Sequence, residues 1–226
     1  MIANDWPLKR QEWNNHQPIN RLPPELLSYI FVLYHYLGPE TRQIGLDEKV
    51  TIVSVHTVVP VVCRFWRKLA INTTALWTFQ CVGNQIPRET TKLFLSRAGT
   101  STPLDIRISI VQVEDTSKSS DANDVEHYCR LACESFCFIL DNGGDPSRWR
   151  SLLVDTNIYS AFLAILALIR ATFMPSLQRL ELYPMAMLLP HPQDIQAWQE
   201  AHDTMSPSEP LFYKPPVELK QLSVSG

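Results

Sequence analysis

Residues 19–31 read INRLPPELLSYIF, and residues 58–77 read VVPVVCRFWRKLAINTTALW. In both segments apolar side chains recur three or four residues apart, which is the spacing of one face of an α-helix. The two segments are joined by a longer, more polar connection. We therefore predict a small helical module over residues 18–77, and the rest of the chain is interpreted outward from it.

The first segment carries the start and stop signals of a helix. Pro24 suits a first helical position, because a residue there needs no backbone N–H for the helix. Glu25 follows in the first turn, where a negative charge suits the helix dipole. Gly38 and Pro39 end the pattern. The expected apolar stripe of this helix is Leu27, Ile30, Phe31, Tyr34 and Leu37.

The second segment predicts an amphipathic helix that opens at Pro60. Its basic side consists of Arg64, Arg67 and Lys68, and its apolar side consists of Val61, Val62, Phe65, Trp66, Leu69 and Ala70. Two short helices of this kind leave much of their apolar surface uncovered. We expect part of that surface to contact a partner.

The order and spacing of four sequence elements resemble those of an F-box, in the form common in mushroom-type fungi. The elements are Leu22-Pro23-Pro24-Glu25, Ile30-Phe31, Val62-Cys63-Arg64 with Trp66, and Leu76-Trp77. The connection over residues 38–59 is longer than in the compact pattern of animals and yeast. The resemblance therefore places the middle helix of the family only loosely, between about Lys49 and Val59.

The resemblance implies a substrate-recognition subunit of a Skp/cullin/F-box ubiquitin ligase. Such a subunit binds a Skp-type adaptor, and through it a cullin, while a C-terminal region holds a protein substrate. It is not an enzyme itself, and no catalytic residue, cofactor or metal is expected. The positions expected to contact the adaptor are Leu22, Pro23, Leu26, Ile30, Phe31, Val62, Cys63 and Trp66. Without the resemblance, the same residues read as the core of an ordinary helical hairpin.

Composition limits the remaining possibilities. The 226 residues are 45% hydrophobic and 19% charged, which indicates one or two globular domains. A net charge of -3 argues against a nucleic-acid or anionic-membrane partner, because such binding needs clustered Lys and Arg. Residues 1–17 contain no signal peptide and are expected to be a flexible lead-in. The apolar run over residues 158–169 is too short for a membrane span and predicts a buried helix.

The five cysteines do not form a disulfide framework, because their number is odd and no secretory signal precedes them. We therefore expect reduced thiols and a location in the cytoplasm or the nucleus. Cys129, Cys133 and Cys137 follow one another at steps of four, which brings them to one side of a helix. A second pair of metal ligands is missing, so a core stripe is favoured over a metal site.

Beyond Trp77, strand-like and helix-like segments alternate, which predicts a parallel sheet of β-α units over residues 78–226. The overall class is thus α+β or α/β. Strands are expected near residues 76–82, 104–113, 151–155, 177–182 and 217–226, helices at 87–98, 124–140, 158–169 and 190–205, and a polar loop at 114–124. SLQRLEL at 176–182 and ELKQLSV at 218–224 resemble the irregular leucine-rich repeats that often follow an F-box. An open α/β sheet is the alternative. Because no capping element follows the last strand, we expect a truncated array or an exposed edge.

The sequence contains no G-x-S-x-G, G-x-G-x-x-G, P-loop or H-E-x-x-H motif. His35, between two tyrosines near the end of the first helix, is expected at the surface or in an interface rather than in catalysis. Two other functions stay open. One is an F-box-like scaffold that recruits no ligase, and the other is a small α/β enzyme with a deep pocket.

Overall fold

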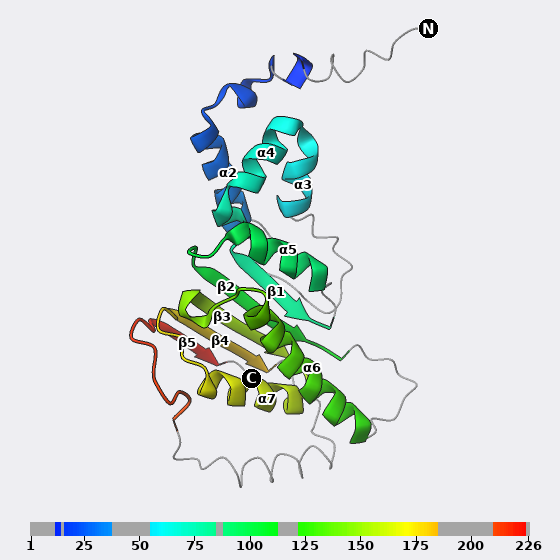
Figure 1. The fold of residues 1–226 in the computed structure, drawn as a ribbon, viewed down its shortest axis with the longest axis vertical. Helices are drawn as coiled ribbons and strands as arrows, with labels where there is room; N and C mark the ends of the chain where they lie inside the picture. Colours follow the sequence, from blue (N-terminus) through cyan, green and yellow to red (C-terminus); the bar gives the residue numbers. More distant parts are fainter. Residues whose placement is uncertain are drawn as a thin grey trace. The chain divides into compact units, whose positions relative to one another are not determined.

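The computed structural model describes residues 12–14, 16–37, 55–84, 88–112, 122–184 and 210–224. The chain divides into two compact units, Met1–Trp77 and Thr78–Gly226, and each is described by itself. Helices form the described part of the first unit, while the second combines helices with a five-stranded parallel sheet (Figure 1). The protein therefore belongs to the mixed α/β class.

The first unit is built from short helices. The elements are η1 (Pro18–Arg21), α2 (Pro24–Leu37), α3 (Val55–Val62), α4 (Arg64–Asn72) and η3 (Thr74–Trp77). The predicted helix start at Pro24 is confirmed, and Glu25 lies in its first turn. The last residue of α2 is Leu37, next to the expected stop at Gly38-Pro39.

The prediction of one helix that opens at Pro60 is wrong. Pro60 lies inside α3, and the chain leaves the helical conformation at Cys63, where φ is −157° and ψ is 169°. The Cys63 Sγ atom accepts a hydrogen bond from the Trp66 N–H at 3.4 Å and so caps α4. The middle helix expected between Lys49 and Val59 overlaps α3, while residues 49–54 lie outside the described part.

One stripe of α2 enters the core of the first unit. Its residues are Leu27, Phe31 and His35, and they pack with residues of the other helices. Trp77 connects η3 to α4, because its Nε1–H donates a hydrogen bond to the Ala70 carbonyl at 2.9 Å. The expected apolar stripe of α2 is thus divided, because Leu27 and Phe31 are buried while Ile30 and Tyr34 are exposed. His35, expected at the surface or in an interface, is buried, with its ring 4.9 Å from that of His56.

The sheet of the second unit confirms the predicted parallel arrangement. Its strands are β1 (Phe79–Gly83), β2 (Leu104–Ile110), β3 (Trp149–Thr156), β4 (Arg179–Pro184) and β5 (Gln221–Val224). Their order in the sheet is their order in the chain, and every neighbouring pair is parallel. Such an order contains no reversal of direction across the sheet.

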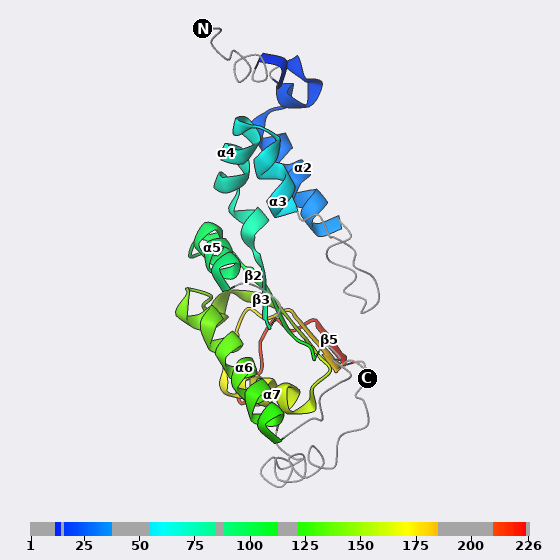
Figure 2. The same ribbon diagram turned by 90° about the vertical axis from the view of Figure 1, so that its right-hand side faces the viewer.

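Helices α5 (Arg88–Ala98), α6 (Ala122–Asp141) and α7 (Tyr159–Ala171) cover one face of this sheet, and the short η4 (Pro146–Arg148) precedes β3 (Figure 2). Parallel crossovers are right-handed, so an order without reversal brings successive helices to the same side. We call the face that α5, α6 and α7 leave uncovered the open face of the sheet.

Successive side chains along each strand point alternately into the core and to the open face. Ile106 and Ile108 of β2 pair with Leu152 and Val154 of β3, and all four side chains are buried. From the helices, Ala132, Phe136, Ile139, Ala161, Ile165 and Ile169 complete this core. Trp149 is fully buried, and its Nε1–H donates to the Gly144 carbonyl at 2.9 Å.

The end of α6 explains that hydrogen bond. Gly143 has a φ of +87°, a left-handed conformation that favours glycine. The backbone then turns back so that Gly144 contacts the last turns of α6. The Gly144 N–H donates to the Ile139 carbonyl at 2.8 Å, so no room for a side chain remains there. The predicted helix stop at these glycines is confirmed.

Several predicted segments differ or lie outside the described residues. Residues 122–124, expected in a polar loop, belong to α6, whereas residues 113–121 are not described. The expected helix at 190–205 and the first eleven residues of the lead-in also lie outside. None of the described helices is both long and apolar enough to cross a membrane.

Candidate docking surface

The second apolar side of α2 is the most prominent exposed feature of the first unit. We call it the outer face of α2, and its residues are Leu26, Tyr29, Ile30, Leu33 and Tyr34. Their spacing of three or four residues places them on one side of the helix. Between 37% and 60% of each residue is exposed, and none carries a charge.

The outer face lies opposite the stripe that fills the core. A surface helix usually has charged and polar residues on its solvent side, whereas a helix that is apolar all round is normally buried. In α2 both sides are apolar, and only one of them is covered within the unit. The outer face is therefore an apolar surface that the described residues of the unit leave exposed.

The junction of α3 and α4 adds a second exposed apolar group. It consists of Val61, Val62 and Phe65. The extended conformation of Cys63 turns the chain between the two helices, so the cap described above also positions this group. The Arg67 Nε–H donates to the Pro60 carbonyl at 2.7 Å and holds the last turn of α3 against α4.

The residues expected to contact an adaptor fall into three groups. Pro23, Leu26, Ile30 and Val62 are exposed, Leu22, Cys63 and Trp66 are half-buried, and Phe31 is in the core with 3% exposed. The ring of Phe31 packs on that of Trp66, with centroids 4.9 Å apart. The Trp66 Nε1–H in turn donates to the Asn20 Oδ1 atom at 2.5 Å. The contact between Phe31 and Trp66 thus holds α2 against α4, the helices that carry the exposed residues Leu26, Ile30 and Phe65.

Sequence reasoning missed part of this surface. Tyr29 and Leu33 were not singled out, although residues 26–34 contain no charge, and that signal could have found them. Val61 and Phe65 were expected in an apolar side and turn out to be exposed. The role of Asn20 had no signal, because its partner Trp66 is 46 residues away.

The open face of the sheet carries charged side chains in pairs. Arg107 and Asp155 form an ion pair at 2.6 Å, with 13% and 6% of their side chains exposed. Arg150 pairs with Asp105. A looser contact of 3.7 Å joins Arg179 to Glu181, and the latter carboxylate raises the pKa of Tyr183. Each arginine of these three pairs has a carboxylate beside it, so the charges of these described residues balance.

Cys81 lies next to Arg107 in the register of β1 and β2. Burial raises the pKa of its thiol to about 11, against the opposing effect of the nearby Arg107. A thiol with this pKa stays protonated at neutral pH and is a poor nucleophile.

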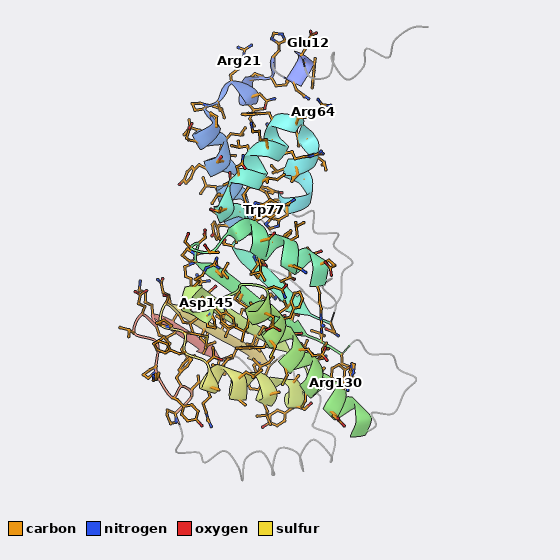
Figure 3. The ribbon with its side chains drawn as sticks, viewed as in Figure 1. Glu12, Arg21, Arg64, Trp77, Arg130 and Asp145 are labelled. Carbon is orange, nitrogen blue, oxygen red and sulfur yellow. The ribbon has the colours of Figure 1, made fainter. Side chains whose placement is uncertain are left out.

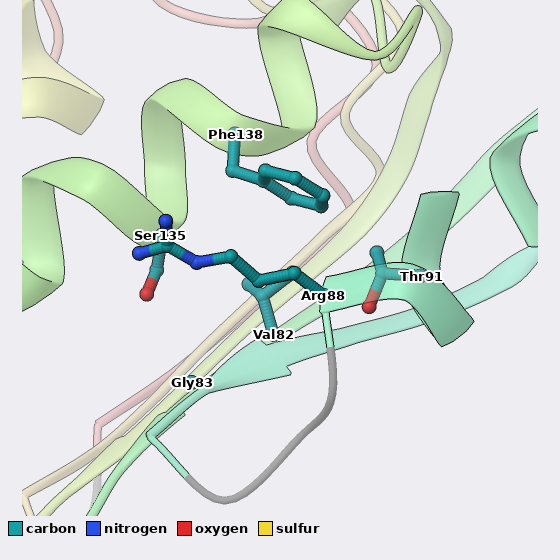
Figure 4. Close-up of a pocket in the computed structure, with 6 residues that line it drawn as sticks. All are labelled: Val82, Gly83, Arg88, Thr91, Ser135 and Phe138. Carbon is teal, nitrogen blue, oxygen red and sulfur yellow. The ribbon is translucent and has the colours of Figure 1, made fainter. Parts of the chain in front are cut away.

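A small recess lies between α5, α6 and the end of β1 (Figure 4). Its space of about 190 Å³ includes open solvent, and the recess encloses no room for a ligand. Arg88 crosses it and pairs with Glu134 at 2.6 Å, and the same guanidinium lies 5.7 Å from the centre of the Phe138 ring. Among the described residues that line the recess, Arg88 is the cation, and the Glu134 carboxylate already pairs with it.

The cysteines of α6 do not form the expected core stripe. Cys129 and Cys133 are half-buried and Cys137 is exposed, while Ala132, Phe136 and Ile139 supply the buried side. Burial raises the pKa of Cys129 and of Cys133. Within the described ranges, no group of three or more His, Cys, Asp or Glu side chains is placed to hold a metal ion.

Comparisons of the chain with protein-family models, with curated proteins and with solved structures find no match.

Proposed function

We propose that this chain is a substrate-recognition subunit of a Skp/cullin/F-box ubiquitin ligase. In this proposal the first unit docks on a Skp-type adaptor, and the second unit binds a protein substrate. The contribution to catalysis is positional, because holding a substrate lysine near the ubiquitin-loaded enzyme raises its effective concentration. The thioester chemistry belongs to other subunits, and the complex acts in the cytoplasm or the nucleus.

The outer face of α2 is the observation that carries the proposal. An isolated unit gains nothing from five exposed apolar residues along one helix, and a docked unit removes them from water. Ile30 belongs both to this face and to the F-box-like pattern of the sequence, and Leu26 is a residue of this face at which the resemblance implies adaptor contact. Pro23 and Val62, also part of that pattern, are exposed as well.

The strand order of the second unit supports the repeat interpretation of the substrate region. Leucine-rich repeats stack one β-α unit on the next, which gives a parallel sheet in chain order with helices on one side. A doubly wound α/β sheet instead reverses its strand order and carries helices on both faces. The described strands follow the first pattern. The open face is then the substrate-binding surface.

A matched pair of variants tests adaptor docking. Leu26 on α2 is 52% exposed, and Leu93 on α5 is 45% exposed. Neither side chain is needed for the core, so Leu26→Asp and Leu93→Asp both leave helical circular dichroism unchanged. We expect Leu26→Asp to abolish capture of a co-expressed fungal Skp-type adaptor, because the new carboxylate would lose its water in the interface. Leu93→Asp captures the adaptor as the wild type does.

The outcomes separate the possible functions. Capture of adaptor and cullin by the wild type, lost only in Leu26→Asp, supports the ligase subunit. Adaptor capture that Leu26→Asp leaves intact contradicts the role of the outer face. If the wild type captures no adaptor, the scaffold function replaces the ligase function.

A further inference from the structure

Helix α4 carries three cations on its solvent side. Arg64, labelled in Figure 3, is its first residue. Arg67 and Lys68 follow at three and four positions. This spacing places the three side chains on one face. All three are exposed, and the exposed Ile71 lies among them at three and four positions from Lys68 and Arg67. We call these three cations the basic face of α4.

The placement of these charges is unfavourable within the unit. Like charges three or four residues apart repel each other along a helix. Arg64 also lies at the N-terminus of α4, the positive end of the helix dipole, where a cation is disfavoured. Arg67 recovers part of the loss through its hydrogen bond to the Pro60 carbonyl, but Arg64 and Lys68 make no contact of that kind with the described residues.

Carboxylates within the described part of the unit do not compensate the basic face. Residues 12–37 and 55–77 contain four Lys and Arg side chains, with Arg21 as the fourth, against the two carboxylates Glu12 and Glu25. Within these ranges no ion pair joins a carboxylate to Arg64, Arg67 or Lys68, whereas arginines of the second unit are paired repeatedly. This part of the first unit is therefore basic in a protein whose net charge is -3.

We infer that the partner surface that docks beside α4 is acidic, with carboxylates that face Arg64 and Lys68. The inference rests on the proposed function and adds the chemistry of the partner. The apolar residues Val61, Val62 and Phe65 at the junction of α3 and α4 form the dry part of the contact, and the basic face forms its charged rim. Rim charges of this kind accelerate association and select the partner more than they raise affinity.

A protein surface fits this face better than an anionic membrane does. Membrane-binding polybasic segments cluster about four to eight Lys or Arg residues, and the basic face has three. The helix is also short, with nine residues, and its buried side, which includes Ala70, is occupied by the core of the unit. An interfacial membrane helix needs that apolar side for the acyl chains.

The test measures association rates of the full chain with a purified fungal Skp-type adaptor at about 50 mM and about 500 mM salt, where screening differs strongly. The variant is Arg64→Glu with Lys68→Glu, and Arg64→Gln with Lys68→Gln removes the charges without reversing them. The control is Lys92→Glu with Lys220→Glu, an equal charge reversal at exposed positions of the second unit. Arg67 is left unchanged because of its hydrogen bond to Pro60.

We expect the charge reversal to lower the association rate about tenfold at low salt and to remove its salt dependence. The association rate of the neutral variant should lie between those of the wild type and the charge reversal. The control variant should associate as fast as the wild type. Wild-type binding that neither salt nor the charge reversal changes overturns the inference and leaves the proposed function intact. Absence of wild-type binding at low salt overturns both.

Vesicles of phosphatidylcholine with and without phosphatidylserine provide the second arm. We expect no binding to either composition. Binding to the anionic vesicles that the Arg64→Glu and Lys68→Glu variant loses would assign the basic face to a membrane and overturn the acidic protein partner.

Discussion

Ile30 and Phe31 are neighbours in the chain, yet their side chains belong to different environments. Phe31 is 3% exposed and packs on Trp66, while Ile30 lies on the outer face of α2. A charge at Phe31 would therefore unfold the unit, and a loss of adaptor binding in such a variant would say nothing about the surface. A charged substitution that tests adaptor binding therefore belongs at an exposed position such as Leu26 or Ile30.

The contrast predicts different stability effects. Phe31→Ala removes a buried ring and should lower the free energy of unfolding of the first unit by about 3–5 kcal/mol. Ile30→Ala at an exposed site should change it by no more than about 0.5 kcal/mol. Urea titrations followed by circular dichroism measure both. Equal unfolding midpoints for the two variants would contradict the burial of Phe31.

At the scale of elements, the sequence predicts regular segments better than breaks and faces. Strict alternation in LDIRISI identifies β2, and Gly143-Gly144 with Pro146 identifies the end of α6. The break at Cys63 has no such signal, because it depends on a thiol that caps the next helix. The buried side of α2 cannot be chosen from periodicity, since both of its sides are apolar.

The ion pair between Arg107 of β2 and Asp155 of β3 is expected to contribute strongly to the stability of the second unit. Asp155→Ala leaves Arg107 on the sheet without its carboxylate and should cost about 3–5 kcal/mol of stability, because the pair is largely buried. Arg179→Ala breaks the more exposed pair with Glu181 and should cost no more than about 1 kcal/mol. Thermal and urea unfolding compare the two.

A double variant, Arg107→Met with Asp155→Leu, removes both charges together. It should recover most of the stability that Asp155→Ala loses, because no uncompensated charge remains. A double variant as unstable as Asp155→Ala would show that the loss comes from packing instead.

At the scale of the whole molecule, the division after Trp77 separates two hydrophobic cores. The core of the first unit is made by α2, α3, α4 and η3, and that of the second by the sheet with α5, α6 and α7. Sequence composition indicated one or two domains but could not locate their cores, because burial is decided by contacts between distant residues such as Phe31 and Trp66.

Two cores predict two unfolding transitions. Domains with their own cores unfold separately, and a single two-state transition then fails to describe the chain. Phe31→Ala should lower the midpoint of one transition and Leu152→Ala that of the other, because these residues are buried in different units. Differential scanning calorimetry measures the midpoints of the two unfolding transitions. One transition that both variants shift equally would contradict the division.

The chain-ordered sheet also bears on how the second unit forms during synthesis. Each strand pairs with the strand that precedes it in the chain, so no strand waits for a distant partner to leave the ribosome. Contacts between neighbours in sequence cost less loop-closure entropy than contacts between the ends of a chain. The sheet can therefore grow from β1 toward β5 as the polypeptide emerges, each new strand added to an edge already in place.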